Sequence, residues 1–522
     1  MRAWLRPSIQ RLPAWRGGRA HGAYGVRGSG LGASPARQTP PEVREVIETT
    51  CVDVDESGEY GICVDETVEG RRRAVFVPGA LPGNILRVAI TGKRKKLTQG
   101  VTLEVIREHR GSVEPLCMYF GACGGMQRHV VHGSPDASHS RSSLARPGCT
   151  LQQMSYEEQL RTKGFRLRNA FERIAGLPAQ HAALIGLDVQ GSADGAYRYR
   201  NRVEFSAADG GFGKHRRGST DLVRIEECAL QSSVADRCYK EILEYLGEQG
   251  QRVADGIEYV SIRSARSGEL LVNVATRVRS DASISALAGR LQERCPSVRG
   301  VVNSVLVKGS PVGLRQVDKV HVVLGSGFLE ERLGDLVCKV SANAFFQVNT
   351  PMTEMLYRHV VDEAAVTPSD VLYDLYCGSG TISLFLAKHG ATPPRSILGV
   401  EMAEVSVEDA RDNVRMNGMD VASEYVCGDV GNLTHIVARG GHAKPDVVVV
   451  DPARSGLSKR ALESILELAP RTVVYVSCNV STQARDVKRF LEGGTYSVTG
   501  LKGFDLYPQT THVESVCTLA RT

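Results

Sequence analysis

The 522-residue sequence has no run of 18 uncharged apolar residues, so it contains no candidate for a membrane-spanning helix. Its 13 cysteines are scattered and odd in number, which excludes the dense disulfide framework of a small secreted domain and predicts free thiols in a reducing compartment. With 42% hydrophobic and 23% charged residues, the composition is that of a globular protein, and the length predicts several domains.

Acidic residues are absent from the first 41 positions, which hold seven arginines among scattered tryptophan, leucine and isoleucine residues. This composition predicts a disordered mitochondrial transit peptide over residues 1–41, and therefore a protein of the mitochondrial matrix. The alternative is a basic tail that binds nucleic acid. Without those seven charges the formal net charge falls from +6 to about −1, so RNA affinity in the rest of the chain has to come from local basic patches.

Five short runs of alternating apolar and polar residues follow in residues 44–110, separated by glycine, proline and charged turns. This pattern predicts a small closed β-barrel of the oligonucleotide-binding type. Two basic turns, 71–73 and 93–96, either bind phosphates or are solvated turn tips, and charge alone does not separate these interpretations.

Residues 111–335 mix helical and strand patterns, which predicts a central α+β domain. A stretch rich in serine, proline and alanine predicts a surface insertion near 130–150. The apolar spacing after Ser155 predicts a helix that stops at Gly176. Arginine and tyrosine alternate at 197–202, which indicates either a nucleic-acid surface or an exposed strand face.

Strands and helices alternate in residues 336–522, which predicts a doubly wound, Rossmann-like α/β domain whose ligands bind beyond the carboxyl ends of the strands. One strand leads into DLYCGSGT (374–381), whose glycines let a ligand approach the backbone. The next strand ends at Glu401, placed to bind ribose hydroxyls. A nicotinamide-dependent dehydrogenase would share both features, but CGD (427–429) and DPAR (451–454) at the next strand ends favour an S-adenosylmethionine methyltransferase.

Three reactive side chains stand at strand ends of this predicted sheet. Cys478 follows the apolar run VVYVS, Glu514 directly precedes another apolar run, and Asp451 follows four valines. A thiol, a base and a second carboxylate suit methylation at carbon 5 of uracil, because a thiolate has to add to carbon 6 and a base has to remove the carbon 5 proton. A buried structural cysteine and an ordinary strand glutamate are the alternatives.

The motifs SANAFFQVNT (341–350), DLYCGSGT, GVE, DPAR, SCN and HVE occur in this order, and the set resembles the RNA uracil-5-methyltransferase family, in particular its mitochondrial tRNA-modifying members in animals. The resemblance covers residues 44–522 and implies an S-adenosylmethionine-dependent enzyme with Cys478 as nucleophile and Glu514 as proton acceptor. The cofactor contacts that it implies are Gln347, Tyr376, Glu401 and Asp451.

The same resemblance implies that residues 44–110 form a TRAM-type RNA-binding barrel and that the partner is tRNA, with the small ribosomal RNA of the organelle as a second candidate substrate. The target uridine would have to leave its stack to be attacked. We expect no membrane contact and no obligate protein partner.

The sequence departs from the family pattern at a cysteine motif. Some bacterial members bind an iron–sulfur cluster through C-x5-C-x2-C and a distant fourth cysteine. Here Cys117, Cys123 and Cys228 match, but Met126 stands at the third position, so we expect neither a cluster nor a metal. The alternatives are an incomplete cluster or a zinc ion, held by the three thiolates together with Cys149 or a histidine.

Two smaller departures are Ala453 and Val480, where the family usually has proline; they affect the stiffness of turns more than the chemistry. Two other functions stay open: an RNA-binding or RNA-folding factor without catalysis, and a cytosine-5 RNA methyltransferase, which uses the same thiol attack. The presence of Cys478, Glu514 and Gln347 argues against the first. Comparing methylation of uridine and cytidine separates the second.

Overall fold

The computed structural model describes residues 45–55, 58–65, 73–94, 97–123, 149–184, 186–208, 211–216, 221–249, 256–279, 281–307 and 316–522. The predicted transit peptide and nearly all of the predicted insertion lie outside these residues. Within the described part of the chain, no helix is both long and apolar enough to cross a membrane.

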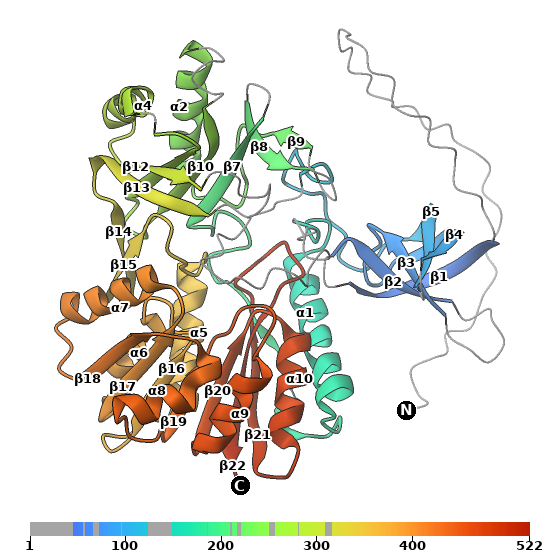
Figure 1. Ribbon diagram of the computed structural model, residues 1–522. Coiled ribbons are helices and arrows are strands. Elements are labelled where there is room, and N and C mark those ends of the chain that lie inside the picture. The colour runs from blue at the N-terminus through green and yellow to red at the C-terminus, as the bar shows by residue number, and fades with distance from the viewer. Residues whose placement is uncertain are drawn as a thin grey trace, which may run out of the picture. The chain divides into compact units, whose positions relative to one another are not determined.

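The N-terminal strands form the expected closed barrel, drawn in blue in Figure 1. Its strands, in the order β1-β2-β3-β5-β4, are β1 (Glu45–Val54), β2 (Tyr60–Asp65), β3 (Arg73–Pro78), β4 (Ile85–Arg94) and β5 (Leu97–Arg107). Alternate residues point inward, so Ile47, Val75 and Val88 pack in one core. Arg73, from one of the two basic turns, forms ion pairs with Asp65 and Glu45 of the barrel itself.

A seven-stranded sheet forms the middle of the chain, with helices α2 and α4 packed on it in one core (Figure 1). The strand order is β13-β12-β11-β10-β7-β8-β9. The bounds are β7 (Arg202–Ala208), β8 (Gly211–His215), β9 (Leu222–Arg224), α2 (Ser233–Gln249), β10 (Ile257–Ser264), β11 (Leu270–Thr276), α4 (Asp281–Arg294), β12 (Val298–Leu306) and β13 (Val317–Gly325). This sheet agrees with the predicted mixed α+β class.

The C-terminal sheet has eight strands in the order β18-β17-β16-β19-β20-β22-β21-β6, and its Rossmann-like class is confirmed. Strands β16 to β20 run parallel, whereas β22 is antiparallel to β20 and to β21. The strands are β6 (Val189–Gln190), β16 (Val371–Leu375), β17 (Ser396–Glu401), β18 (Ala422–Cys427), β19 (Val447–Val450), β20 (Thr472–Ser477), β21 (Tyr496–Phe504) and β22 (Glu514–Arg521).

Helices cover both faces of this sheet, which is why its central strands are buried along their whole length and mostly apolar (Figure 1). One face packs against α5 (Thr350–Ala364), α6 (Thr381–His389) and α7 (Glu404–Met416). The other face packs against α1 (Tyr156–Ala170), α8 (Leu433–Gly440), α9 (Lys459–Leu468) and α10 (Val480–Leu491).

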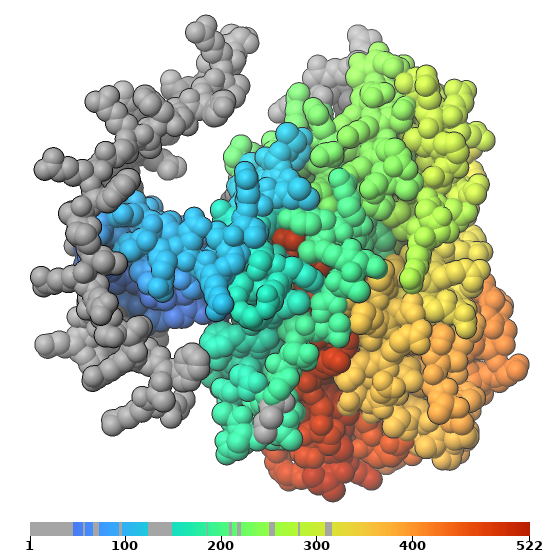
Figure 2. All heavy atoms as spheres, turned by 180° about the vertical axis from the view of Figure 1, so that it is seen from behind, coloured from blue at the N-terminus to red at the C-terminus, as the bar shows by residue number. Residues whose placement is uncertain are grey.

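The predicted boundary between the central and C-terminal domains differs from the structure. Helix α1, predicted in the central domain, packs against α10, and β6 pairs with β21 at the edge of the C-terminal sheet. Figure 2 shows the teal segment that contains α1 lying against the red C-terminal part. The predicted break at 335/336 also falls in the turn of the hairpin β14 (Phe328–Leu333) and β15 (Leu336–Ser341). Local patterns specify helices and strands, but not which distant sheet they join.

Candidate active site

The turn after β16 brings backbone atoms close to Glu401. Tyr376, Gly378 and Gly380 have positive φ angles of 61°, 53° and 73°, and a Cβ at Gly380 would lie 2.8 Å from the Tyr425 ring. Gly378 N–H donates to Oε2 of Glu401 at 3.2 Å, and Ala403 N–H donates to Oε1 at 2.8 Å. Glu401 is thereby fixed at the end of β17, and Tyr376 begins the turn beside it.

Two carboxylates lie together at the ends of β16 and β19, where Asp374 is fully buried and Asp451 is half-buried. Burial raises the pKa of Asp374 to about 6, although Ser383 donates to its Oδ2 through both N–H and Oγ–H. Burial and the charge of Asp374 raise the pKa of Asp451 to about 7, and a hydrogen bond with the Gln347 side chain opposes the rise. The two carboxylates make this place favourable for a cationic ligand.

A second observation, two buried polar atoms without a hydrogen-bond partner in the described part of the chain, also suits a sulfonium cofactor at this place. Oδ1 of Asp374 and Oε1 of Gln347 are buried and have no hydrogen-bond partner among the described residues. Buried polar atoms are normally satisfied, so two such atoms beside Asp451 indicate a place for a polar or positively charged group. The residues around Asp451 therefore suit a sulfonium group, and the assignment of Gln347, Tyr376, Glu401 and Asp451 as contacts of S-adenosylmethionine stays a prediction.

The tip of β20 holds Cys478 between a strand and a helix cap. Asn479 is the N-cap of α10, where its Oδ1 accepts from the N–H groups of Ser481 and Thr482. Asn479 Nδ2 and Thr482 Oγ1 both donate to the carbonyl of Arg454, at 3.2 and 3.0 Å. The polar residues after Cys478 therefore fasten the thiol-bearing turn to the DPAR turn.

Strand register places Glu514 across from this thiol. Ser477 of β20 pairs with Ser515 of antiparallel β22, so the next position on each strand end is Cys478 and Glu514. Glu514 is 1% exposed, and its Oε2 has no hydrogen-bond partner among the described residues. Burial and the charge of Asp451 raise its pKa, and Arg454 opposes the rise.

The same neighbours act on the thiol. Burial, followed by the charges of Glu514 and Asp451, raises the pKa of Cys478, while Arg454 lowers it. Arg454 Nη2 lies 3.4 Å from Nδ1 of His512, and His512 itself is kept neutral because burial and nearby cations lower its pKa. Arg454 is thus the cation that favours the thiolate in this site.

The structure brings together Cys478, Glu514, Asp451 and Gln347, and places Tyr376 and Glu401 at neighbouring strand ends. Sequence reasoning gave no role to Asp374 or His512. The sequence signal for Asp374 was a charged residue in an otherwise mostly apolar strand, and the signal for His512 was its place two positions before Glu514.

The four cysteines considered for a metal lie around one cavity, which is lined by Cys117, Cys123, Cys149 and Cys228. Among the described residues, no three or more histidine, cysteine, aspartate or glutamate side chains are arranged to hold a metal ion. Met126, at the third position of the cysteine motif, lies outside those residues.

Comparison with known proteins identifies the family. The family described as tRNA (uracil-5-)-methyltransferase matches residues 155–426 and 433–522. An uncharacterized RNA methyltransferase of Chlorobaculum tepidum is 31% identical over 507 residues, covering 91% of this chain and 96% of that protein. One of Halalkalibacterium halodurans is 32% identical over 496 residues, covering 92% and 98%.

A solved structure shares the fold. The Pyrococcus abyssi tRNA (uracil-54, C5)-methyltransferase, in complex with S-adenosyl-L-homocysteine, aligns with a TM-score of 0.63 and 23% identity, covering 91% of this chain and all of that one. The chain therefore belongs to the tRNA (uracil-5-)-methyltransferase family and is an S-adenosylmethionine-dependent RNA (uracil-5-)-methyltransferase.

Proposed function

We propose that this enzyme forms 5-methyluridine in the T-loop of mitochondrial tRNA through a covalent adduct between Cys478 and the uracil ring. The observation that carries the proposal is the placement of Cys478 and Glu514 on facing strand ends beside Asp451. A thiol and a carboxylate on facing strand ends match the two tasks of the reaction, addition to carbon 6 and removal of the carbon 5 proton.

The side chains divide the reaction as follows. Cys478 loses its proton to solvent, and its Sγ bonds to carbon 6, which moves the ring electrons toward oxygen 4 and makes carbon 5 nucleophilic. S-adenosylmethionine, when bound, supplies an electrophilic methyl group. Glu514 then takes the proton from carbon 5, the ring double bond re-forms, and the bond from Sγ to carbon 6 breaks to return the thiolate.

The proposed tRNA position and the proposed mitochondrial location are supported by different observations. The family is described by its tRNA substrate, and the Pyrococcus abyssi neighbour is named for uracil 54, a T-loop position. The arginine-rich, acid-free residues 1–41 support import into mitochondria.

The proposal is tested by nucleoside mass spectrometry of mitochondrial RNA from cells with and without this gene. We expect 5-methyluridine to disappear from the tRNA fraction of cells lacking the gene and to return with the wild-type gene, but not with Cys478→Ala. Loss confined to small-subunit rRNA would replace tRNA by rRNA as the substrate. Loss of 5-methylcytidine instead would favour the cytosine-5 alternative, and unchanged nucleosides would contradict the proposal.

Arg454 gives a prediction on pH dependence. Because this cation lowers the pKa of Cys478 and opposes the rise in Glu514, Arg454→Met leaves both groups protonated to higher pH. Both must be deprotonated to act, so activity rises with pH, and we expect the variant's rising limb to lie at higher pH, with about tenfold lower kcat at pH 7. The measurement is kcat between pH 6 and 9.5. The exposed Arg439, at the end of α8, provides the control Arg439→Met, and equal profiles for all three proteins would exclude the role of Arg454.

A further inference from the structure

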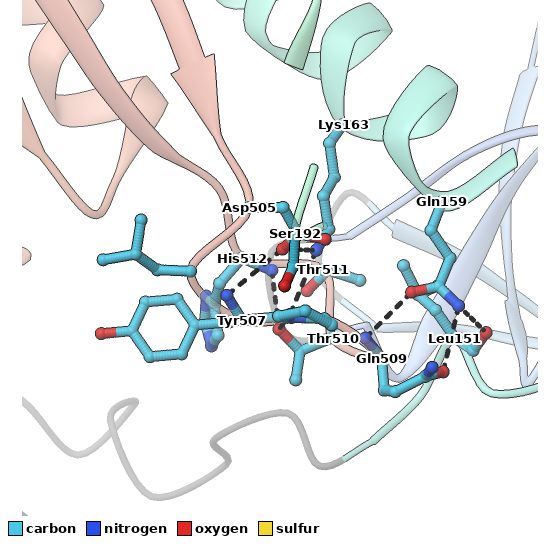
Figure 3. A network of polar contacts seen from close by, with 12 residues as sticks. Leu151, Gln159, Lys163, Ser192, Asp505, Tyr507, Gln509, Thr510, Thr511 and His512 are labelled. Atoms are coloured by element: carbon cyan, nitrogen blue, oxygen red, sulfur yellow. Dashed lines mark hydrogen bonds and ion pairs between the residues drawn. The ribbon is translucent and has the colours of Figure 1, made fainter. Parts of the chain in front are cut away.

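The loop between β21 and β22, residues 505–513, leads directly into Glu514 and is largely buried. Loops usually satisfy their backbone groups with water, whereas a buried loop needs partners within the protein. Figure 3 shows this loop surrounded by polar side chains, including Gln159 and Lys163 of α1.

Most carbonyls of the loop are taken by residues from distant parts of the chain. Two side chains of α1 donate to this loop: Lys163 Nζ to the carbonyl of Tyr507 at 3.1 Å and Arg166 Nη1 to that of Thr511 at 2.7 Å. Tyr199 OH donates to the carbonyl of Pro508 at 3.1 Å, and Leu151 N–H donates to that of Gln509 at 3.1 Å. The fifth donor is Asn349 Nδ2, which lies 3.3 Å from the carbonyl oxygen of Leu506. Four of the five donors lie between residues 151 and 199. The segment that precedes the central sheet therefore fixes the approach to Glu514.

A buried ion pair anchors the beginning of the loop. Lys163 Nζ lies 2.6 Å from Oδ1 of Asp505, and both side chains have zero exposure. Asp505 Oδ1 also accepts from the N–H of Tyr507 at 3.2 Å. A fully buried pair contributes little net stability, because each charge loses its hydration, so fixing the geometry of the loop is the better explanation of this pair.

A reciprocal amide pair anchors the middle of the loop (Figure 3). Gln159 Nε2 donates to Oε1 of Gln509 at 3.0 Å, and Gln509 N–H donates to Oε1 of Gln159 at 2.9 Å. Gln509 has a φ of 71°, a left-handed conformation that is unfavourable for glutamine and persists only where its surroundings impose it.

The nucleophile has a separate support. Cys478 is held through Asn479 and Thr482 on the carbonyl of Arg454, and none of these contacts involves α1. The loop also touches Arg454 through His512, and α1 packs against α10, so disturbing the anchors on α1 should displace the base, which directly follows the loop, more than the thiol.

We propose that Lys163 and Asp505 are positioning residues, which act through the 505–513 loop to hold Glu514 where it can remove the carbon 5 proton. The inference rests on the proposed function, since it assigns Glu514 the elimination step. It predicts a defect confined to that step: addition and methylation proceed, and release of the methylated RNA is slow.

The test is the double variant Lys163→Met/Asp505→Asn, which removes both charges together and so leaves no unpaired buried charge. The asparagine that replaces Asp505 retains an oxygen that can accept from Tyr507 N–H. We expect kcat on transcribed tRNA to fall about 10²-fold, the KM for tRNA to stay within about twofold of wild type, and methylated covalent adduct to accumulate on denaturing gels. Formation of the adduct with 5-fluorouridine RNA should keep its wild-type rate, because that reaction stops before the carbon 5 proton is removed.

The control is Arg471→Met/Asp370→Asn, which carries the same kinds of change at a more exposed ion pair at the opposite end of the sheet, before β20 and β16. We expect this control to turn over like wild type without adduct. A folded Lys163→Met/Asp505→Asn protein with normal kcat, or one whose reaction with 5-fluorouridine RNA is equally slow, would overturn the inference.

Two further outcomes distinguish a failure of this inference from a failure of the proposed function. If wild-type enzyme forms no adduct with 5-fluorouridine RNA, the proposed function fails and the inference fails with it. If thermal melting shows that the double variant does not fold, Tyr199→Phe decides, because it removes one loop anchor and no charge. We expect that variant to lose about fivefold in kcat with detectable adduct, and unchanged turnover would overturn the inference.

Discussion

Cys478→Ala is expected to lose methyl transfer to uridine by about 10⁴-fold or more, because the variant lacks the thiol that forms the bond to carbon 6 and so makes carbon 5 nucleophilic. The decisive measurement uses tRNA that carries 5-fluorouridine at the target. Wild-type enzyme should give a complex that survives denaturing electrophoresis, because carbon 5 carries fluorine in place of the proton that the base would remove. Cys478→Ala should give no such complex.

Cys517→Ala provides the matched control for this experiment. Cys517 is a fully buried thiol of β22, three residues after Glu514, and it is not one of the residues of the site. We expect the control to form the complex normally. Turnover by Cys478→Ala would contradict the adduct mechanism, and retention of every cellular effect by that variant would favour an RNA-folding role without catalysis.

The second large effect is expected for Glu514→Gln. The amide has nearly the same shape but cannot take the carbon 5 proton, so kcat should fall by about 10²- to 10⁴-fold while methylated adduct accumulates on ordinary tRNA. The assay follows labelled methyl groups into a protein–RNA band on denaturing gels. Glu363→Gln, on α5, is the control, and we expect it to turn over without a stable adduct. Fast turnover by Glu514→Gln would assign the proton transfer to another group.

The stability of the same variant tests the burial of Glu514. Its pKa is raised in the folded protein, so the contribution of this group to folding is fully present below its unfolded pKa and is lost as pH rises through the folded pKa. Glutamine has no charge to bury. We therefore expect Glu514→Gln to melt at a higher temperature than wild type near pH 8, with the difference shrinking toward pH 4. A lower melting temperature at pH 8 would show that the carboxylate is better paired than the structure indicates.

Much of this arrangement was predictable because it is local. Apolar runs that end in CGSG, DPAR and SCN specify strand ends, and parallel strands bring those ends to one edge of a sheet, which places Asp451 and Cys478 near each other. The barrel was predictable for a similar reason, since its strands alternate and are consecutive in the chain.

The rest depends on contacts between distant segments. No local pattern indicates that α1 joins the C-terminal sheet, or that Lys163 meets Asp505 more than 300 residues later. The pKa values of Asp374 and Asp451 are likewise raised chiefly by burial, which follows only from the assembled fold.

The antiparallel pairing of β20 with β22 limits where insertions and deletions can be tolerated in the sequence. Side chains alternate between the two faces of a strand, so deleting or inserting one codon within either strand would turn every later side chain of that strand to the other face. Cys478 and Glu514 are 36 positions apart in the sequence, and the pairing of β20 with β22 places them opposite each other. Viable length changes between Cys478 and Glu514 should therefore fall outside the paired segments, for example at the exposed Gly493–Gly494 turn between α10 and β21.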